Sequence, residues 1–354
     1  MIRDLSLRNF RNYESAHLEF RPGLNMILGE NAQGKTNLLE SLVYLSLTRS
    51  FRLNDDTKAI REGQEFADIR CTADQQKLEI ILHKKGKTLL VNKVPVKRSS
   101  EFIGKLNVVL FTPDDLGIFA DAPRERRKML NQEITKISGT YLTALNHLQN
   151  LLKDRNTLLK TVSPDLIYLD TLDQKLCEYS LPVIQERKKF IEQINLTLND
   201  EFHEISGMEE KAEVIYNCCV DEADIPHLAK MLRNSRERDI ESRMTNTGIH
   251  REDITFMLDG KNVIYHASQG QKRMILLAFK LALLSYVEKE TGHQAVLLLD
   301  DVLSELDPQR QKRLLKRIER TEQCLITAAE IPPHLDTGRI STYRIHDGKT
   351  EVSV

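Results

Sequence analysis

Residues 29–36 read Gly29-Glu30-Asn31-Ala32-Gln33-Gly34-Lys35-Thr36, and this stretch decides the fold. It matches the pattern G-x-x-x-x-G-K-[ST] in full. A strand-like apolar run precedes it at residues 24–28, and a helical pattern follows at 36–47. Loops of this kind curl so that backbone N–H groups face an anion, and glycines permit the curvature. The order of strand, loop and helix predicts a nucleotide-binding α/β domain, with a chance glycine-rich turn as the alternative.

We expect this phosphate-binding loop (P-loop) to hold ATP. Its predicted contacts are Gly29, Glu30, Asn31, Ala32, Gln33, Gly34, Lys35 and Thr36. Lys35 would reach the β- and γ-phosphates, and the Thr36 hydroxyl would bind Mg²⁺.

A second element of the site is expected at residues 296–301, which read Val-Leu-Leu-Leu-Asp-Asp. Four apolar residues predict a buried strand, and carboxylates at its C-terminal end lie where α/β sheets bind ligands. Asp300 would hold the magnesium ion with Thr36, and Asp301 would orient the attacking water. An acidic turn after a strand is an equal alternative for this stretch alone. Together with the P-loop it predicts Lys35, Asp300 and Asp301 as catalytic.

A second anion site is indicated at Ser268, Gly270 and Gln271, in a Ser-x-Gly-Gln sequence that begins a helical pattern. A hydroxyl, backbone N–H groups and a helix N-terminus together can bind phosphate. For this motif alone, ordinary N-capping of the helix by Ser268 is the favoured interpretation.

The remaining patterns suggest one α/β domain made from both ends of the chain. Strands alternate with helices from residue 268 to 345, which predicts a largely parallel sheet. Residues 123–208 have a helical period, interrupted by Pro164 and Pro182, and the charged stretch 233–243 is expected to link back to the first layer. We therefore predict an ATPase domain at 1–122 and 246–354, with a mainly helical insertion at 123–245.

Composition narrows the classes of protein. Among 354 residues, 51 Lys and Arg balance 52 Asp and Glu, so any nucleic-acid surface must be a local patch. No apolar run approaches the roughly 20 residues that span a bilayer, so no membrane partner is expected. Five scattered cysteines fit a reducing cytoplasm, and the vicinal pair Cys218-Cys219 is interpreted as chance.

Taken in order, these motifs resemble the ABC-type P-loop ATPase heads, and most closely the RecF family. The resemblance extends from residue 1 to the C-terminus. It includes the opening at residues 7–13, the Phe-Thr-Pro-Asp-Asp-Leu stretch at 111–116 and the Leu-Asp-Asp-Val-Leu-Ser-Glu-Leu-Asp stretch at 299–307.

The resemblance implies that ATP joins two copies head to tail. Ser268, Gly270 and Gln271 of one copy would then face the γ-phosphate held by the other, with Ser304 and Asp307 at the interface. Arg11 and Asn12 would lie near the nucleotide, although a solvated loop charge is an equal alternative for Arg11.

The sequence also departs from the family pattern. Gln269 stands where transporters have a glycine, Asp301 replaces the usual glutamate, and no histidine follows the strand at 324–327. The shorter side chain of Asp301 predicts slow ATP hydrolysis. A weak DNA-dependent ATPase is therefore one interpretation, and whether the chain is an enzyme stays open. Ile249 replaces a proline before His250 and Arg251, so DNA or subunit contact and an ordinary loop remain equal alternatives for these two residues.

By resemblance, the expected function is an ATP-dependent DNA-binding clamp in recombinational repair and replication-gap maintenance. The expected partners are double-stranded and gapped DNA, a second copy, RecO- and RecR-type mediators and a recombinase. The candidate basic groups are Lys93, Lys97 and Arg98; Arg124, Arg126, Arg127 and Lys128; Arg187, Lys188 and Lys189; and the stretch 310–320. Interleaved glutamates make solvated helix faces the favoured interpretation of each group alone. The alternatives are a structural SMC-type head, a transporter subunit and a small-molecule kinase. The insertion is too short for the long coiled-coil arms of an SMC-type head. The missing histidine counts against a transporter subunit, and the Ser268 motif counts against a kinase.

Overall fold

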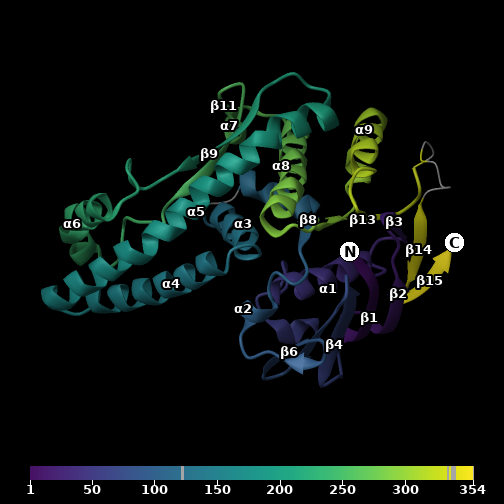
Figure 1. Cartoon of the computed structure of the whole chain (residues 1–354), viewed down its shortest axis with the longest axis horizontal. Coiled ribbons are helices and arrows are strands. Elements are labelled where there is room, and N and C mark those ends of the chain that lie inside the picture. Colours follow the sequence, from purple (N-terminus) through teal and green to yellow (C-terminus); the bar gives the residue numbers. More distant parts are fainter. Residues whose placement is uncertain (121–122, 333–334, 336–339, 354) are drawn as a thin grey trace. The chain divides into compact units, whose positions relative to one another are not determined.

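The computed structural model describes residues 1–120, 123–332, 335 and 340–353. The chain divides into two compact units (Figure 1). The first contains Met1–Leu116, Thr197–Glu210 and Arg273–Val354, and the second contains Gly117–Leu196 and Lys211–Lys272. The expected domain limit at residue 122 falls outside the described residues, and the division into 1–122 with 246–354 and 123–245 stays a prediction.

Two six-stranded sheets form the frame of the first unit. The antiparallel sheet has the order β2-β1-β4-β5-β6-β7, with β1 Ile2–Phe10, β2 Tyr13–Glu19, β4 Phe66–Ala73, β5 Gln76–His83, β6 Gly86–Val91 and β7 Val94–Pro95. The second sheet has the order β15-β14-β3-β13-β12-β8, with β3 Gly23–Leu28, β8 Val108–Phe111, β12 Val296–Leu299, β13 Gln323–Ala328, β14 Ser341–His346 and β15 Lys349–Ser353. Its strands are parallel except for the β14–β15 hairpin, which confirms the predicted α/β class with a largely parallel sheet.

Helix α1, Lys35–Leu47, packs between these two sheets and contacts β4, β5 and β8 (Figure 1). Eleven of its thirteen residues are buried, so the helix is covered around its whole circumference and not along one stripe. Strands β12 and β13 are buried at every position, as expected for parallel strands covered on both faces. The hydrophobic core of the unit includes residues of β3 and of α1, the two elements that the loop joins.

The shorter elements of the first unit are α2 Ser99–Phe102, η1 Asp56–Ala59, η3 Leu303–Glu305 and α9 Pro308–Ile318. Helix α9 is tied to residues 197–210 by two ion pairs. Arg317 contacts Glu201 at 2.6 Å, and Arg320 contacts Glu204 at 2.7 Å.

The second unit contains helices and a small sheet. Its helices are α3 Pro123–Thr135, α4 Gly139–Leu159, the greater part of α5 Leu166–Ser206, α6 Ile225–Ser242, α7 Val263–His266 and the start of α8 Gln269–Thr291. Its sheet has the order β11-β10-β9, with β9 Ala212–Asn217, β10 Asp253–Leu258 and β11 Lys261–Asn262. The 3₁₀ turn η2, Pro113–Phe119, begins in the first unit and ends in the second.

Several sequence predictions were wrong in this part of the chain. Pro182 does not interrupt the helical pattern, because α5 continues through it. The proline removes one backbone N–H, but Val183 and Ile184 after it are fully buried, and their packing outweighs the lost bond. Residues 233–243 lie largely within α6 and are not a linker. Strands β9, β10 and β11 of this unit were missed, as were β4 and β15 of the first unit.

Candidate functional site

The P-loop is held in a tightly curved conformation. Gly34 has a φ of 116°, and a Cβ atom there would lie 2.6 Å from the Asn12 amide nitrogen. The Asn12 amide donates to the Gln33 carbonyl oxygen at 2.9 Å, and the Tyr13 hydroxyl donates to the Gly34 carbonyl oxygen at 2.9 Å. Only glycine fits at position 34, because the β1–β2 turn packs directly against the loop.

Lys35 lies at the start of α1, and its side chain folds back over the loop. The ammonium group donates to the carbonyl oxygens of Gly29 and Glu30, the latter at 2.9 Å. Burial lowers the pKa of Lys35, while the carboxylates of Asp301 and Asp300 oppose that shift. The amine is therefore fixed by the loop and lies within the electrostatic reach of both carboxylates.

Asp300, which follows β12, connects helix α1 with strand β13. One carboxylate oxygen accepts from the Thr36 hydroxyl at 2.8 Å, and the other accepts from the Thr327 hydroxyl at 2.6 Å. This contact follows from topology, because β13, which carries Thr327, pairs with both β3 and β12. Thr327 was missed by sequence reasoning, although a threonine near the end of a fully buried strand is a detectable signal.

Asp301 has a left-handed backbone conformation, with a φ of 46°. Its N–H donates to the Thr327 hydroxyl at 2.9 Å, and its carbonyl oxygen accepts from the Ser304 hydroxyl at 2.8 Å. Aspartate tolerates this conformation better than most residues, and strained backbone of this kind is common at functional sites.

These groups line one cavity of about 430 Å³ within the first unit. The residues around it are Glu30, Asn31, Ala32, Gly34, Lys35, Thr36, Asn37, Phe51, Arg52, Thr112, Pro113, Asp114, Asp300 and Asp301. The structure thus brings the three predicted catalytic residues together with most of the P-loop. Phe51 and Arg52 were not predicted as site residues. Arg52 contacts the Phe51 ring, and it also donates to Asn37 at 2.6 Å.

Arg11 and Asn12 support the loop and do not line the cavity. Arg11 forms a bidentate pair with Glu40, at 2.8 and 3.0 Å. Glu40 is fully buried in α1 and also accepts from Ser50 and Arg52. Burial alone would raise the pKa of Glu40, but these hydrogen bonds outweigh it, and the pKa is lowered. The expectation that Arg11 contacts nucleotide stays a prediction.

The C-terminal hairpin also contacts the P-loop. The Asp347 N–H donates to the Gln33 side-chain oxygen at 2.6 Å, and the Gly348 N–H donates to the Gln33 carbonyl at 3.3 Å. Gly348 has a φ of 71°, and a Cβ atom there would lie 2.7 Å from the Asn12 carbonyl oxygen. The hairpin between β14 and β15 is therefore part of the support for the loop.

Replacing Gly348 with alanine is expected to weaken ATP binding several-fold. The new methyl group must push Asn12, and with it the P-loop, away from the hairpin. Gly292→Ala is the matched control, because Gly292 has a φ of 70° with nothing within 4 Å of its Cβ position. Both variants should lose about 1–2 kcal/mol of stability through backbone strain. Isothermal titration with ATP checks the prediction, which fails if both variants bind ATP equally well.

The Ser268 motif lies in the second unit, at the N-terminus of α8. The Ser268 hydroxyl accepts from the Gln271 N–H at 3.2 Å, and the Gln271 side chain accepts from the Ser268 N–H at 2.9 Å. This reciprocal pair is a capping box. Ser268 is exposed, and Gly270 follows it in the first turn of the helix. The ordinary N-cap interpretation therefore describes the local contacts, and a role toward phosphate stays a prediction.

Ser304 lies in the turn η3, between β12 and α9, and Asp307 directly precedes α9. Asp307 caps α9 by accepting from the N–H groups of Gln309 and Arg310, at 3.1 and 3.0 Å. Both Asp307 and Ser304 are exposed. The local structure leaves them accessible to another molecule, as the interface prediction requires.

Two arginines of the candidate basic groups are buried within the second unit, so neither DNA contact nor a solvated helix face describes them. Arg126 pairs with Asp253 at 2.8 Å, and Arg187 pairs with Glu252 at 2.6 Å. Both arginines are at most 5% exposed. Including them among the candidate DNA contacts was wrong, because their guanidinium groups cannot reach a phosphate.

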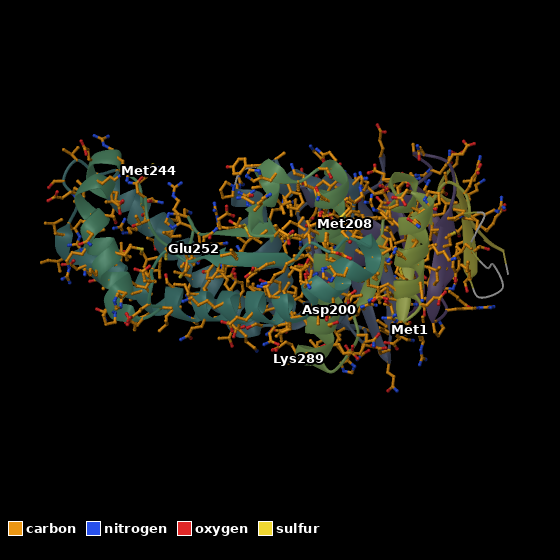
Figure 2. All side chains as sticks on the ribbon, turned by 90° about the horizontal axis from the view of Figure 1, so that it is seen from above. Met1, Asp200, Met208, Met244, Glu252 and Lys289 are labelled. Atoms are coloured by element: carbon orange, nitrogen blue, oxygen red, sulfur yellow. The ribbon has the colours of Figure 1, made fainter. Side chains whose placement is uncertain are left out.

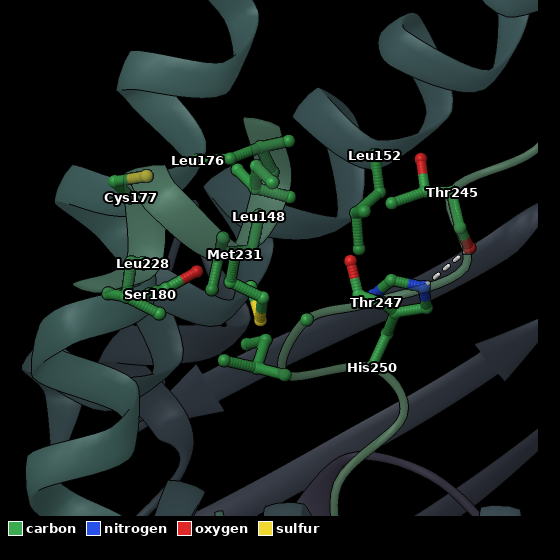
Figure 3. A pocket seen from close by; sticks show the side chains of 13 residues that line it. Leu148, Leu152, Leu176, Cys177, Ser180, Leu228, Met231, Thr245, Thr247 and His250 are labelled. Atoms are coloured by element: carbon green, nitrogen blue, oxygen red, sulfur yellow. Dashed lines mark hydrogen bonds between the residues drawn. The ribbon is translucent and has the colours of Figure 1, made fainter. Parts of the chain in front are cut away.

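His250 is part of the packing around a small cavity in the second unit (Figure 3). Its Nε2 lies 3.0 Å from the Thr245 carbonyl oxygen, and burial lowers the pKa of the imidazole. The cavity holds about 10 Å³, enough for no more than a water molecule. These contacts favour the loop interpretation of His250.

This chain is similar to known proteins over most of its length. The family model described as the RecF/RecN/SMC N terminal domain matches residues 1–333. The DNA replication and repair protein RecF of Lachnoclostridium phytofermentans is 38% identical over 354 residues, which cover 98% of this chain and 97% of that protein. RecF of Streptococcus suis is 39% identical over 359 residues, covering 99% and 98%. The chain belongs to the RecF family.

Solved structures agree with the family assignment. The solved structure of the recombination mediator protein RecF-ATP of the RecFOR pathway is 33% identical in sequence and matches with a TM-score of 0.90. The match covers 100% of this chain and 97% of that one. The Smc head of Pyrococcus furiosus is 18% identical with a TM-score of 0.56, so its likeness concerns the fold alone. The predicted ATPase-head fold and the RecF resemblance are confirmed. Among the described residues, no helix is long and apolar enough to cross a membrane.

Proposed function

We propose that this chain is an ATP-controlled DNA-binding clamp that acts as a recombination mediator. The observation that carries the proposal is the single cavity that contains Lys35, Thr36, Asp300 and Asp301. A lysine over a P-loop, a hydroxyl and two carboxylates are the groups that bind and position a nucleoside triphosphate. RecF relatives named as DNA replication and repair proteins, and a RecF solved with ATP, support the choice of ATP and of DNA.

Thr36 and Asp300 would hold Mg²⁺. A hydroxyl and a carboxylate 2.8 Å apart supply hard oxygen donors, which suit this ion. Thr327 fixes the second carboxylate oxygen and so keeps the first one directed at Thr36. The ion would neutralise charge on the phosphates when bound. Asp301, held by Thr327 and Ser304, would orient water from a short side chain, so we expect slow hydrolysis that times release from DNA.

The site would be completed by a second copy of the chain. Ser268 is exposed at the N-terminus of α8, with Gly270 and Gln271 partly exposed in the first turn, and Ser304 and Asp307 are exposed beside the carboxylates. If the γ-phosphate contacts both copies, ATP binds only the closed dimer and shifts the monomer–dimer equilibrium toward it. The closed dimer would bind DNA at junctions of single and double strands. RecO- and RecR-type mediators would then help it load a recombinase.

Sedimentation velocity with and without Mg-ATP tests the dimer. The wild-type chain should sediment as a monomer alone and as a dimer with ATP, and Ser268→Ala should reduce the dimer fraction severalfold. Asp224→Ala is the matched control, since Asp224 also caps a helix, by accepting from the His227 N–H at 2.8 Å. Each variant loses a cap worth about 1 kcal/mol. If the wild-type chain still sediments as a monomer with Mg-ATP, the proposed clamp mechanism is wrong.

A further inference from the structure

A cluster of two thiols and a carboxylate lies in the second unit. Cys218 and Cys219 directly follow β9, and Glu252 directly precedes β10. The two strands are antiparallel, with Asn217 opposite Asp253, so their register brings the cysteines beside the glutamate. The three ligand atoms, two sulfurs and one carboxylate oxygen, lie within 4.8 Å of one another.

Glu252, which is labelled in Figure 2, is fixed so that one of its carboxylate oxygens faces the thiols. Its Oε2 accepts from Arg187 at 2.6 Å and from the Tyr216 hydroxyl. Its Oε1 lies 3.5 Å from the Cys218 sulfur and accepts from the Cys219 N–H at 3.1 Å. Arg187 and Glu252 are at most 3% exposed, so the carboxylate cannot turn away without breaking a buried ion pair.

We propose that Cys218, Cys219 and Glu252 bind one thiophilic divalent cation of the Zn²⁺ type. Two sulfurs and one oxygen are a ligand set that zinc accepts, with a fourth position left to solvent. Tetrahedral zinc holds two sulfur ligands roughly 3.8 Å apart, so small side-chain rotations would complete the site. Arg187 and Tyr216 would act as outer partners that orient the ligating carboxylate.

The accessibility of the two thiols is consistent with metal binding. Both cysteines are partly exposed, whereas Cys71, Cys177 and Cys324 are buried. We therefore propose a metal site in place of the earlier interpretation that the vicinal pair Cys218-Cys219 occurs by chance. The cluster shares no residue with the ATP cavity, and its test is independent of the proposed function.

A second group of possible ligands provides the control. Glu222, Asp224 and His227 also lie within 4.8 Å of one another, but two of the three are exposed. Asp224 already accepts from both the His227 N–H and its ring nitrogen, each at 2.8 Å. We expect this exposed group to contribute little to zinc affinity.

The experiment titrates the reduced full-length chain with Zn²⁺ against a chromophoric chelator. The wild type should bind one equivalent. Replacing both cysteines (Cys218→Ser with Cys219→Ser) should weaken binding at least about 100-fold, given that even outer-partner changes cost 10–100-fold. His227→Ala should bind as the wild type does. No binding by the wild type, or loss in His227→Ala with retention in the cysteine variant, would overturn the proposal.

A second measurement uses the wild-type chain, so its result does not depend on whether the cysteine variants fold. Cd²⁺ should produce a thiolate charge-transfer band in the ultraviolet and should protect Cys218 and Cys219 together from alkylation, as mapped by peptide mass spectrometry. Alkylation of both cysteines at the same rate with and without Cd²⁺ would contradict the site.

Discussion

Replacing Lys35 with alanine is expected to lower the rate of ATP hydrolysis at least about 100-fold, the scale of losing one preorganised charge at a reacting phosphate. The ammonium group is fixed by the carbonyl oxygens of Gly29 and Glu30. Among the described residues that line the cavity, Arg52 is the other positively charged one. Arg52 is already committed to Glu40 and Asn37, so it cannot take over the phosphate contact. A phosphate-release assay at saturating ATP measures the effect.

Lys77→Ala is the control for this prediction, because Lys77 is an exposed lysine on β5 outside the cavity. It should hydrolyse ATP at the wild-type rate. Equal rates in Lys35→Ala and the wild type would mean that hydrolysis occurs elsewhere or arises from a contaminant.

Replacing Glu40 with glutamine is expected to lower the free energy of unfolding by about 3 kcal/mol, at the low end for a broken buried ion pair. The change keeps the volume but leaves Arg11 and Arg52 without their carboxylate. The low end applies because these arginines are 18% and 32% exposed and keep some contact with water. Urea unfolding measures the difference. Glu14→Gln, which breaks the exposed pair with Arg61, should cost less than about 1 kcal/mol.

The Glu40 effect should depend on pH in one direction. The pKa of Glu40 is lowered below its ordinary value of 4.5, so the folded state favours the charged carboxylate. Its contribution is fully present above pH 4.5 and is lost as the pH falls through the folded-state pKa. The gap between wild type and Glu40→Gln should therefore narrow only in acid. A gap that narrows on raising the pH from 5 to 8 would contradict this assignment.

The sequence predicted the elements whose signals are local. The strand–loop–helix order at residues 24–47, the four apolar residues before Asp300 and the alternation near the C-terminus each reflect contacts between neighbours in the chain. They were sufficient for the α/β class and for placing Lys35, Thr36 and Asp300 in one site.

The residues that were missed depend on which strands become neighbours. Thr327 reaches Asp300 because β13 lies between β3 and β12, and the Asp347–Gly348 turn reaches Gln33 because β14 lies beside β3. Arg187 reads as one cation in a basic run, but folding buries it against Glu252. No local pattern reports these long-range pairings, so motif reasoning could place the loop but not its supports.

The most direct test of the clamp is the affinity for gapped duplex DNA, measured by fluorescence anisotropy with and without Mg-ATP at fixed physiological salt. Salt must be fixed because phosphate contacts make affinity depend steeply on it. We predict that ATP tightens binding at least about tenfold for the wild type and not for Lys35→Ala, since only the nucleotide-bound dimer closes on DNA. Equal affinity with and without ATP would separate DNA binding from the nucleotide site and contradict the account.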